Sequence, residues 1–137
     1  MKLLDTNAVI ALLNGNKTAR ARFEAALSAR TVVAVSSVVL FELQYGVAKS
    51  ARREENTERL DAFVSGPIET LDFEIDDATI TGEIRAKLER SGVPIGPYDV
   101  LIAGQAIRHG AVLVTANKKE FARVAGLKLE DWTLARG

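Results

Sequence analysis

The sequence of residues 111–121 is AVLVTANKKEF, a short apolar run that leads into a polar turn and a charged segment. The run is rich in β-branched residues, and it is too short for a helix, so it predicts a buried strand. The charged segment predicts a short helix through Phe121. A strand followed by a helix is the unit from which helix-covered sheets are built.

The same unit recurs along the whole chain. Further strands are predicted at residues 2–4, 32–35 and 68–71, and a last one around 127–129 or 132–134. Helices are predicted at residues 6–13, 17–30, 37–50, 52–64, 76–90 and 98–109. Strands that alternate with helices form a parallel sheet covered on both faces, so we expect an α/β fold, a three-layer α/β/α domain with a central, mainly parallel sheet.

Composition limits the classes of protein. A chain of 137 residues with 47% apolar content is one domain's worth, so residues 1–137 are expected to form a single domain. The absence of cysteine excludes disulfides and thiolate metal sites. We find no signal peptide and no apolar run near the roughly 20 residues of a membrane helix, which predicts a cytoplasmic protein without a membrane partner. Eighteen basic and eighteen acidic residues cancel, so any nucleic-acid contact must come from local basic patches.

Three acidic residues stand where predicted strands give way to helices. Asp5 follows the first strand, Glu42 lies one turn into a helix among apolar neighbours, and Asp99 is in the first turn of an otherwise apolar helix. Ligands of open parallel sheets bind beyond the carboxyl ends of the strands, so these acids could share a site. Each also has an ordinary explanation, because Asp5 can cap a helix, Glu42 can mark a solvent-facing side, and Asp99 suits the helix dipole.

The loop after the strand at 111–115 offers a fourth position, at Asn117 or Glu120, and either residue could also be only a cap. Four polar positions at one edge of a sheet are better explained together than separately. Oxygen ligands without cysteine favour Mg²⁺ or Mn²⁺ over zinc. The single histidine, His109, is interpreted as a C-terminal helix residue beside Gly110 and not as a catalytic group.

Four segments, in their order along the chain, resemble the motifs of the PIN-domain family, and within it those of the VapC toxins of bacterial toxin–antitoxin pairs. They are Leu4–Asn7, Phe41–Gly46, Pro94–Ala103 and Leu113–Phe121, and the similarity covers essentially the whole chain. The resemblance implies that the catalytic, metal-binding carboxylates are Asp5, Glu42, Asp99 and Glu120. Many relatives have an aspartate in the last loop, so Asn117 is a further candidate ligand and the fourth position stays open.

The resemblance also implies a Mg²⁺- or Mn²⁺-dependent endoribonuclease that cleaves structured RNA, such as tRNA or rRNA. A bound cation would lower the pKa of a water molecule for in-line attack on phosphorus, leaving a 5′-phosphate and a 3′-hydroxyl. The residues expected to hold the carboxylates and waters in place are Thr6, Asn7 and Thr115.

Contacts with RNA are predicted at Lys118 and Lys119, which lie in the loop nearest to the acids. Tyr45 or Tyr98 could stack on a base or pack at the helix surface. The remaining basic residues on nearby or outer helices are interpreted mainly as solvated surface; they are Arg20, Arg22, Lys49, Arg52, Arg53, Arg85, Lys87 and Arg90.

VapC-type toxins form dimers and are inhibited by a small antitoxin whose segment fills the active-site groove. The resemblance therefore predicts a cognate VapB-like antitoxin, a homodimer, a larger toxin–antitoxin assembly, and contact with operator DNA only through the antitoxin. Apolar residues that could supply these surfaces, or could equally belong to the core, are Val38, Phe41, Leu43, Tyr45 and Val47.

Two alternatives to the nuclease remain. The first is a non-catalytic module with the same fold, which acts with its antitoxin on operator DNA. The second is a phosphoacceptor receiver domain, which needs paired acids after the first strand and a lysine after a late strand. Asp5 has no acidic neighbour, and Lys118 lies beyond the end of its strand, so the sequence disfavours the receiver domain.

Overall fold

A computed structural model describes residues 1–135, in which five strands form one sheet of order β3-β2-β1-β4-β5. Every neighbouring pair of strands is parallel, which confirms the predicted parallel sheet. The strands are β1 (Lys2–Leu4), β2 (Val33–Ser36), β3 (Glu69–Leu71), β4 (Val112–Val114) and β5 (Lys128–Glu130). Because β1 lies between β2 and β4, the strand order reverses there, and ligands of open α/β sheets bind at such a point.

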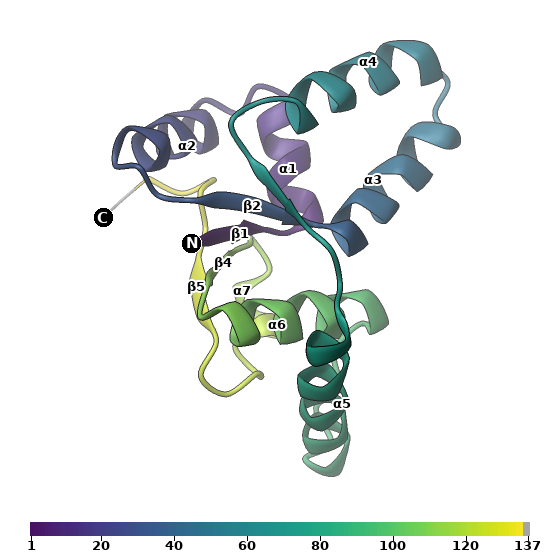
Figure 1. The fold of residues 1–137 in the computed structure, drawn as a ribbon, viewed down its shortest axis with the longest axis vertical. Helices are drawn as coiled ribbons and strands as arrows, with labels where there is room; N and C mark the ends of the chain where they lie inside the picture. The colour runs from purple at the N-terminus through teal and green to yellow at the C-terminus, as the bar shows by residue number, and fades with distance from the viewer. Residues whose placement is uncertain (136–137) are drawn as a thin grey trace.

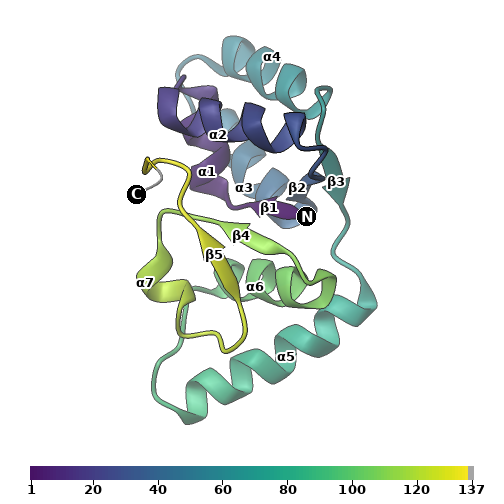
Figure 2. The same ribbon diagram turned by 90° about the vertical axis from the view of Figure 1, so that its left-hand side faces the viewer.

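Helices cover the sheet on both faces. Helices α1 to α4 lie on one side and α5 to α7 on the other, which confirms the three-layer arrangement (Figures 1 and 2). The helices are α1 (Thr6–Leu13), α2 (Lys17–Ser28), α3 (Ser37–Ala48), α4 (Arg53–Val64), α5 (Ile75–Arg90), α6 (Pro97–His109) and α7 (Lys118–Phe121). None of the helices within residues 1–135 is long and apolar enough to cross a membrane.

The three central strands form the middle of the hydrophobic core. Except for Val112, which is half-buried, their apolar side chains are fully or almost fully buried between the two helical layers, as expected for parallel strands with both faces covered. The buried apolar residues on these strands are Leu3, Leu4, Val33, Ala34, Val35, Leu113 and Val114. Burial on both faces explains why these strands are short apolar runs without alternation.

Close packing between α5 and α6 fixes the direction of α6. A Cβ atom at Gly104 would lie 2.0 Å from Thr81 Oγ1, so only glycine permits this approach of the two helices. Gly110, at φ 60°, ends α6 in the left-handed conformation beside His109, as the sequence predicts. The other end of α6, at Pro97, is therefore held in a defined place beside the carboxyl edge of the sheet.

The last strand is the element that the sequence left ambiguous. The structure places it at Lys128–Glu130, so the alternative at residues 132–134 is wrong. Trp132 is instead buried against Phe23, and Asp131 accepts hydrogen bonds from the backbone and hydroxyl of Thr133 in a tight turn. The apolar pattern at residues 132–134 therefore reflects burial of the Trp132 ring and not pairing of a strand in the sheet.

Candidate active site

Asp5 follows β1 directly and is also the N-cap of α1. Its Oδ1 accepts a hydrogen bond of 2.8 Å from the amide of Ala8, and its side chain is 5% exposed. Burial raises the pKa of Asp5, helped by the negative charges of Glu42 and Asp131, while hydrogen bonds from Thr115 and Ala8 oppose the change. Asp5 is therefore both a helix cap and a member of the acidic site. One of its oxygens caps α1, and the charges of neighbouring acids raise the pKa of the same carboxyl group.

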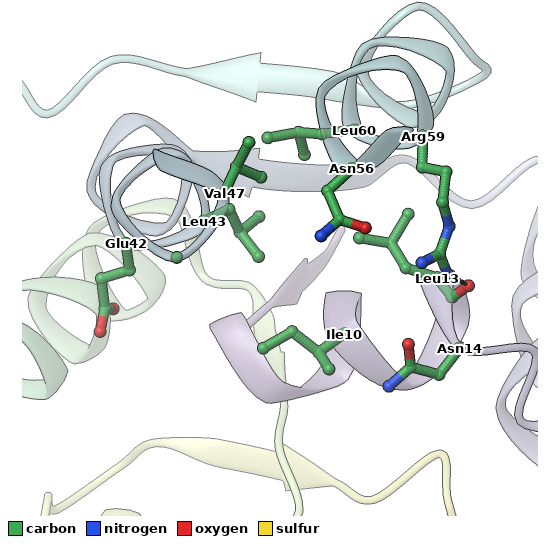
Figure 3. Close-up of a pocket in the computed structure, with 10 residues that line it drawn as sticks. Ile10, Leu13, Asn14, Glu42, Leu43, Val47, Asn56, Arg59 and Leu60 are labelled. Carbon is green, nitrogen blue, oxygen red and sulfur yellow. Dashed lines mark hydrogen bonds between the residues drawn. The ribbon is translucent and has the colours of Figure 1, made fainter. Parts of the chain in front are cut away.

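Glu42 is half-buried on α3, one turn into the helix. Its Oε1 accepts a hydrogen bond of 2.8 Å from the hydroxyl of Thr6, which lies in the first turn of α1. Figure 3 shows the Glu42 carboxylate pointing away from Leu43 and Leu60, on the side of α6. Glu42 therefore belongs with Asp5 and not to a solvent-facing side of α3.

Asp99 lies in the first turn of α6, after the N-cap residue Gly96. Burial raises its pKa to about 6, and the charges of Glu120, Glu42 and Asp5 add to the rise. A position at a helix N-terminus would by itself lower this pKa. Burial and the neighbouring carboxylates thus outweigh the helix dipole, so the dipole alone does not explain Asp99.

Glu120, on α7, is fixed by two donors. The amide of Gly96 donates to Oε1 at 2.8 Å, and Asn117 Nδ2 donates to Oε2 at 2.7 Å. These hydrogen bonds lower the pKa of Glu120, and a further hydrogen bond joins Glu120 to Asp99. The pKa of Glu120 is thus lowered while that of Asp99 is raised, because Glu120 has amide donors of its own, whereas Asp99 is half-buried and faces the negative charge of Glu120.

The smaller polar residues divide into two groups. Thr6 holds Glu42, while Thr115 donates to Asp5 and accepts a hydrogen bond of 2.9 Å from the amide of Asn117. Asn7 is exposed, and within residues 1–135 its side chain makes no hydrogen bond to the four acids. The two threonines thus link the carboxylates to neighbouring elements.

The four acids interact through their charges without forming a closed ligand cage. Within the part of the chain that the structure describes, no three acidic or histidine side chains lie close enough together to hold an ion as they stand. The acids come from four elements, since Asp5 follows β1 and the others lie on α3, α6 and α7. Tertiary contacts between these elements bring the predicted residues to one edge of the sheet.

Asp131 is an acidic neighbour that the sequence interpretation missed. It follows β5 directly, at the same edge of the sheet, and its charge contributes to the raised pKa of Asp5. The signal was the one that identified Asp5, an acid immediately after a strand. It was hidden because the position of the last strand was ambiguous.

The basic residues differ in their surroundings. Arg22 is only 15% exposed at its side chain and donates to the carbonyls of Asp131 and Leu134, so it fastens the C-terminal segment and is not an RNA contact. Lys118 and Lys119 are exposed on α7, next to Glu120. Lys49 lies over the ring of Tyr45, with its Nζ 4.7 Å from the ring centroid. These lysines remain accessible to a ligand.

A groove between α1, α3 and α4 reaches the acids at Glu42 (Figure 3). It encloses about 620 Å³, part of which is open to solvent, and has polar groups at Asn14, Asn56 and Arg59. Its apolar residues are Ile10, Leu13, Leu43, Val47 and Leu60. Of the apolar residues considered for partner surfaces, Leu43 is buried, Val38 and Val47 are half-buried, and Phe41 and Tyr45 are exposed.

Comparison with protein families matches the PIN domain over residues 2–127. The tRNA(fMet)-specific endonuclease VapC of Shigella flexneri is 45% identical over 131 residues, which cover 96% of this chain and 97% of the relative. Ribonuclease VapC2 of Rickettsia felis is 42% identical over 95% of this chain and 96% of its own length.

Solved structures agree with these relatives. The crystal structure of VapBC2 from Rickettsia felis bound to a DNA fragment from its promoter matches with a TM-score of 0.90 and 41% identity, over 96% of this chain and 98% of that one. The crystal structure of DNA-bound VapBC from Salmonella typhimurium matches with a TM-score of 0.88 and 42% identity, over 96% of this chain and 97% of that one.

Proposed function

This chain belongs to the PIN-domain family and is a VapC-type ribonuclease, and from this premise we propose that the four acids at the edge of its sheet are the catalytic site. They are Asp5, Glu42, Asp99 and Glu120. The observation that carries the proposal is that acids from four separate elements meet at one edge of the sheet, close enough that the charges of the other three add to the burial that raises the pKa of Asp99. Such mutual repulsion is relieved when a cation binds.

We infer that the cation is Mg²⁺ or Mn²⁺. Nucleases of this family generally depend on divalent metals, and an oxygen-only donor set suits these two ions. Asp5, Glu42 and Asp99 would hold the metal, with Glu120 as the fourth acid. When bound, the metal lowers the pKa of water and neutralises charge on the phosphate. The chain itself holds three of the four carboxylates, since Thr6 donates to Glu42, Thr115 to Asp5 and the amide of Gly96 to Glu120.

The fourth position is assigned to Glu120 in this proposal. Asn117 donates its amide nitrogen to Glu120 Oε2, so the proposed role of Asn117 is to orient Glu120. Asn7, exposed at the start of α1, would act only through water.

The proposed substrate is a structured RNA, a tRNA or rRNA, cut to a 5′-phosphate and a 3′-hydroxyl. The relative from Shigella flexneri is named for tRNA(fMet), and the relative from Rickettsia felis is named a ribonuclease. Lys118 and Lys119 are the proposed phosphate contacts, because they are exposed beside Glu120. Residues 1–137 would act as one domain in the cytoplasm.

Cleavage by isosteric variants tests the site. Asp5→Asn and Asp99→Asn remove a charge while keeping the side-chain shape, and each is expected to slow RNA cleavage by about a hundredfold or more. The matched control is Asp61→Asn, an exposed aspartate on α4, which should cleave as the wild type does. Sequencing of RNA ends after induction, with circular dichroism of the purified variants, would measure both activity and fold.

Wild-type cleavage by Asp5→Asn would contradict the assigned site. A wild-type chain that cuts no RNA, yet binds operator DNA together with its antitoxin, would identify the non-catalytic alternative. Loss of growth inhibition in Asp5→Asn would separate the enzyme from that alternative in cells.

We further propose a cognate VapB-like antitoxin as the partner, with a homodimer and a larger toxin–antitoxin assembly that reaches operator DNA through the antitoxin. The matching Rickettsia felis and Salmonella typhimurium structures are VapBC complexes bound to DNA. The groove between α1, α3 and α4 offers an apolar bed that leads to Glu42. A segment with apolar side chains and one basic residue would fit this groove.

Substitution of Ile10, which is 39% exposed in the groove, tests this partner. Ile10→Lys is expected to weaken antitoxin binding by about tenfold or more, because it places a charge on an apolar contact. Val32→Lys, at a residue 40% exposed beside the start of β2, is the control. Calorimetric titration with the purified antitoxin would measure both, and equal affinities would place the antitoxin elsewhere.

A further inference from the structure

Three aromatic rings are exposed beside the acids. Phe41 and Tyr45 on α3 are 52% and 59% exposed, and Tyr98 on α6 is 46% exposed. The ring centroids of Phe41 and Tyr98 lie 5.5 Å apart with an angle of 61° between the planes, an edge-to-face contact that joins α3 to α6. The rings are thus held in place without being part of the core.

Each member of this pair adjoins an acid in the sequence. Phe41 precedes Glu42, and Tyr98 precedes Asp99. In Figure 1 the beginning of α3 lies above the right-hand end of α6, and these two helices are in contact. The aromatic pair therefore lies at the rim of the carboxylate site.

Tyr45 and Lys49 continue this line away from the acids. Phe41 and Tyr45 on α3 and Lys49, its C-cap residue, are spaced four residues apart, so they share one face of the helix. Lys49 Nζ lies 4.7 Å from the centroid of the Tyr45 ring. We call the set Tyr98, Phe41, Tyr45 and Lys49 the aromatic track.

The charge of this chain explains why binding of a nucleic acid would need contacts other than electrostatic attraction. The chain has no net charge, so its overall field does not attract a polyanion, and the four acids repel phosphates locally. Aromatic rings bind bases by stacking, which needs no net charge and tolerates any sequence. Unpaired loops of structured RNA present bases that can be stacked in this way.

We propose that the aromatic track binds a single-stranded segment of the RNA substrate, with unpaired bases stacked on Tyr98, Phe41 and Tyr45. Lys49 contacts a phosphate of the same segment. The track would place the RNA strand so that a phosphate next to the stacked bases enters the carboxylate site. This proposal rests on the ribonuclease function proposed above, and it names the residues that grip the substrate.

Binding of a fluorescein-labelled, single-stranded RNA of about ten nucleotides tests the track. Fluorescence anisotropy would be measured in the Asp5→Asn background, so that the probe is not cut. Tyr98→Ala and Tyr45→Ala are each expected to weaken binding by about 5- to 100-fold. Tyr98→Phe and Tyr45→Phe keep the ring and should bind as the parent does. Ile75→Ala removes an exposed side chain at the start of α5 and is the control for lost surface.

Salt dependence separates stacking from charge. Tyr98→Ala should weaken binding at every salt concentration without changing the slope of log affinity against log salt. Lys49→Gln should reduce that slope by about 0.7, the value for one phosphate contact on a single strand. Lys128→Gln is the control, because Lys128 starts β5 at the opposite edge of the sheet.

Unchanged affinity in both alanine variants would overturn the track while the wild type still cleaves RNA. A wild type that does not cleave RNA would overturn the proposed function instead, so the two failures are distinct. Sedimentation of the same variants gives the remaining outcome. If either alanine substitution converts a dimer into a monomer, the face joins two copies of the chain, and the proposal is wrong.

Discussion

Acidic groups at the two ends of α6 are held in opposite ways, although Asp77 is buried and Asp99 is half-buried. Near its C-terminal end, Arg108 pairs with Asp77 of α5, which is 0% exposed, and also lies 3.2 Å from Glu74. Burial alone would raise the pKa of Asp77, but the hydrogen bonds and charge of Arg108 outweigh it, and the pKa is lowered. At the N-terminal end, Asp99 faces other carboxylates and its pKa is raised to about 6.

This difference shows which negative charges serve the fold and which are left for a ligand. A buried carboxylate is stable when the chain supplies its own cation, as Arg108 does for Asp77. At the other end, none of the ion pairs within residues 1–135 includes one of the four acids, and the one basic side chain that lowers a pKa there, Arg123, acts on Glu120 and not on Asp99. A region that the chain leaves with unbalanced acids is where an external cation is expected.

The largest expected effect on stability is at the C-terminal end of α6, where Arg108 pairs with Asp77. Arg108→Ala would leave the carboxylate of Asp77 buried and unpaired, so we expect the free energy of unfolding to fall by about 3 to 5 kcal/mol. Arg85→Ala is the matched control, because Arg85 forms an exposed pair with Glu89 and should cost less than about 1 kcal/mol. Urea unfolding would measure both variants, and equal losses would show that Asp77 does not depend on its partner.

A smaller effect on stability is expected when a divalent cation binds the four acids near the N-terminal end of α6. At a free Mn²⁺ concentration of about 100 times the Kd, binding should add about 2.7 kcal/mol to stability. The melting temperature of the wild type should rise by several degrees. The double variant Asp5→Asn with Asp99→Asn should lose this rise. An unchanged melting temperature in the wild type, or an equal rise in the double variant, would refute the metal site.

The smallest effect is the pH dependence of the metal-free protein. Asp99 has a pKa of about 6 in the folded chain and an ordinary value of 3.8, so between these values the folded state holds the extra proton. Its contribution to stability is therefore present below about pH 4 and is lost as pH rises through about 6. After allowance for solvent screening, the loss is about 1 kcal/mol.

Asp99→Asn should remove this loss, which urea unfolding in EDTA at acidic and neutral pH would measure. Asp77 has the opposite sign, because its lowered pKa gives stability that is lost only as pH falls towards that value. Identical pH profiles for the wild type and Asp99→Asn would show that the repulsion at the site has no energetic consequence.

The elements and the acids were predictable because both are encoded locally. Apolar periodicity predicted the helices to within about two residues at each end. Asp5 follows its strand directly, and parallel strands bring their carboxyl ends to one edge, so the site's location followed from order alone. The hydrogen bond from Gly96 to Glu120, the role of Asp131 and the pairing of Arg22 were not predictable, because each joins residues far apart in the sequence.

The sequence by itself determined a parallel α/β fold, the edge of the sheet where the acids gather, and the family, because each depends on short segments in a fixed order. Only the tertiary structure decided which acid has a basic partner and which has acidic neighbours. Asp77 and Asp99 are both aspartates in the first turn of a helix, and nothing local separates them. Arg108, one helix away, is in reach of Asp77, whereas Asp99 meets Glu120, and burial turns that difference in partners into opposite pKa changes.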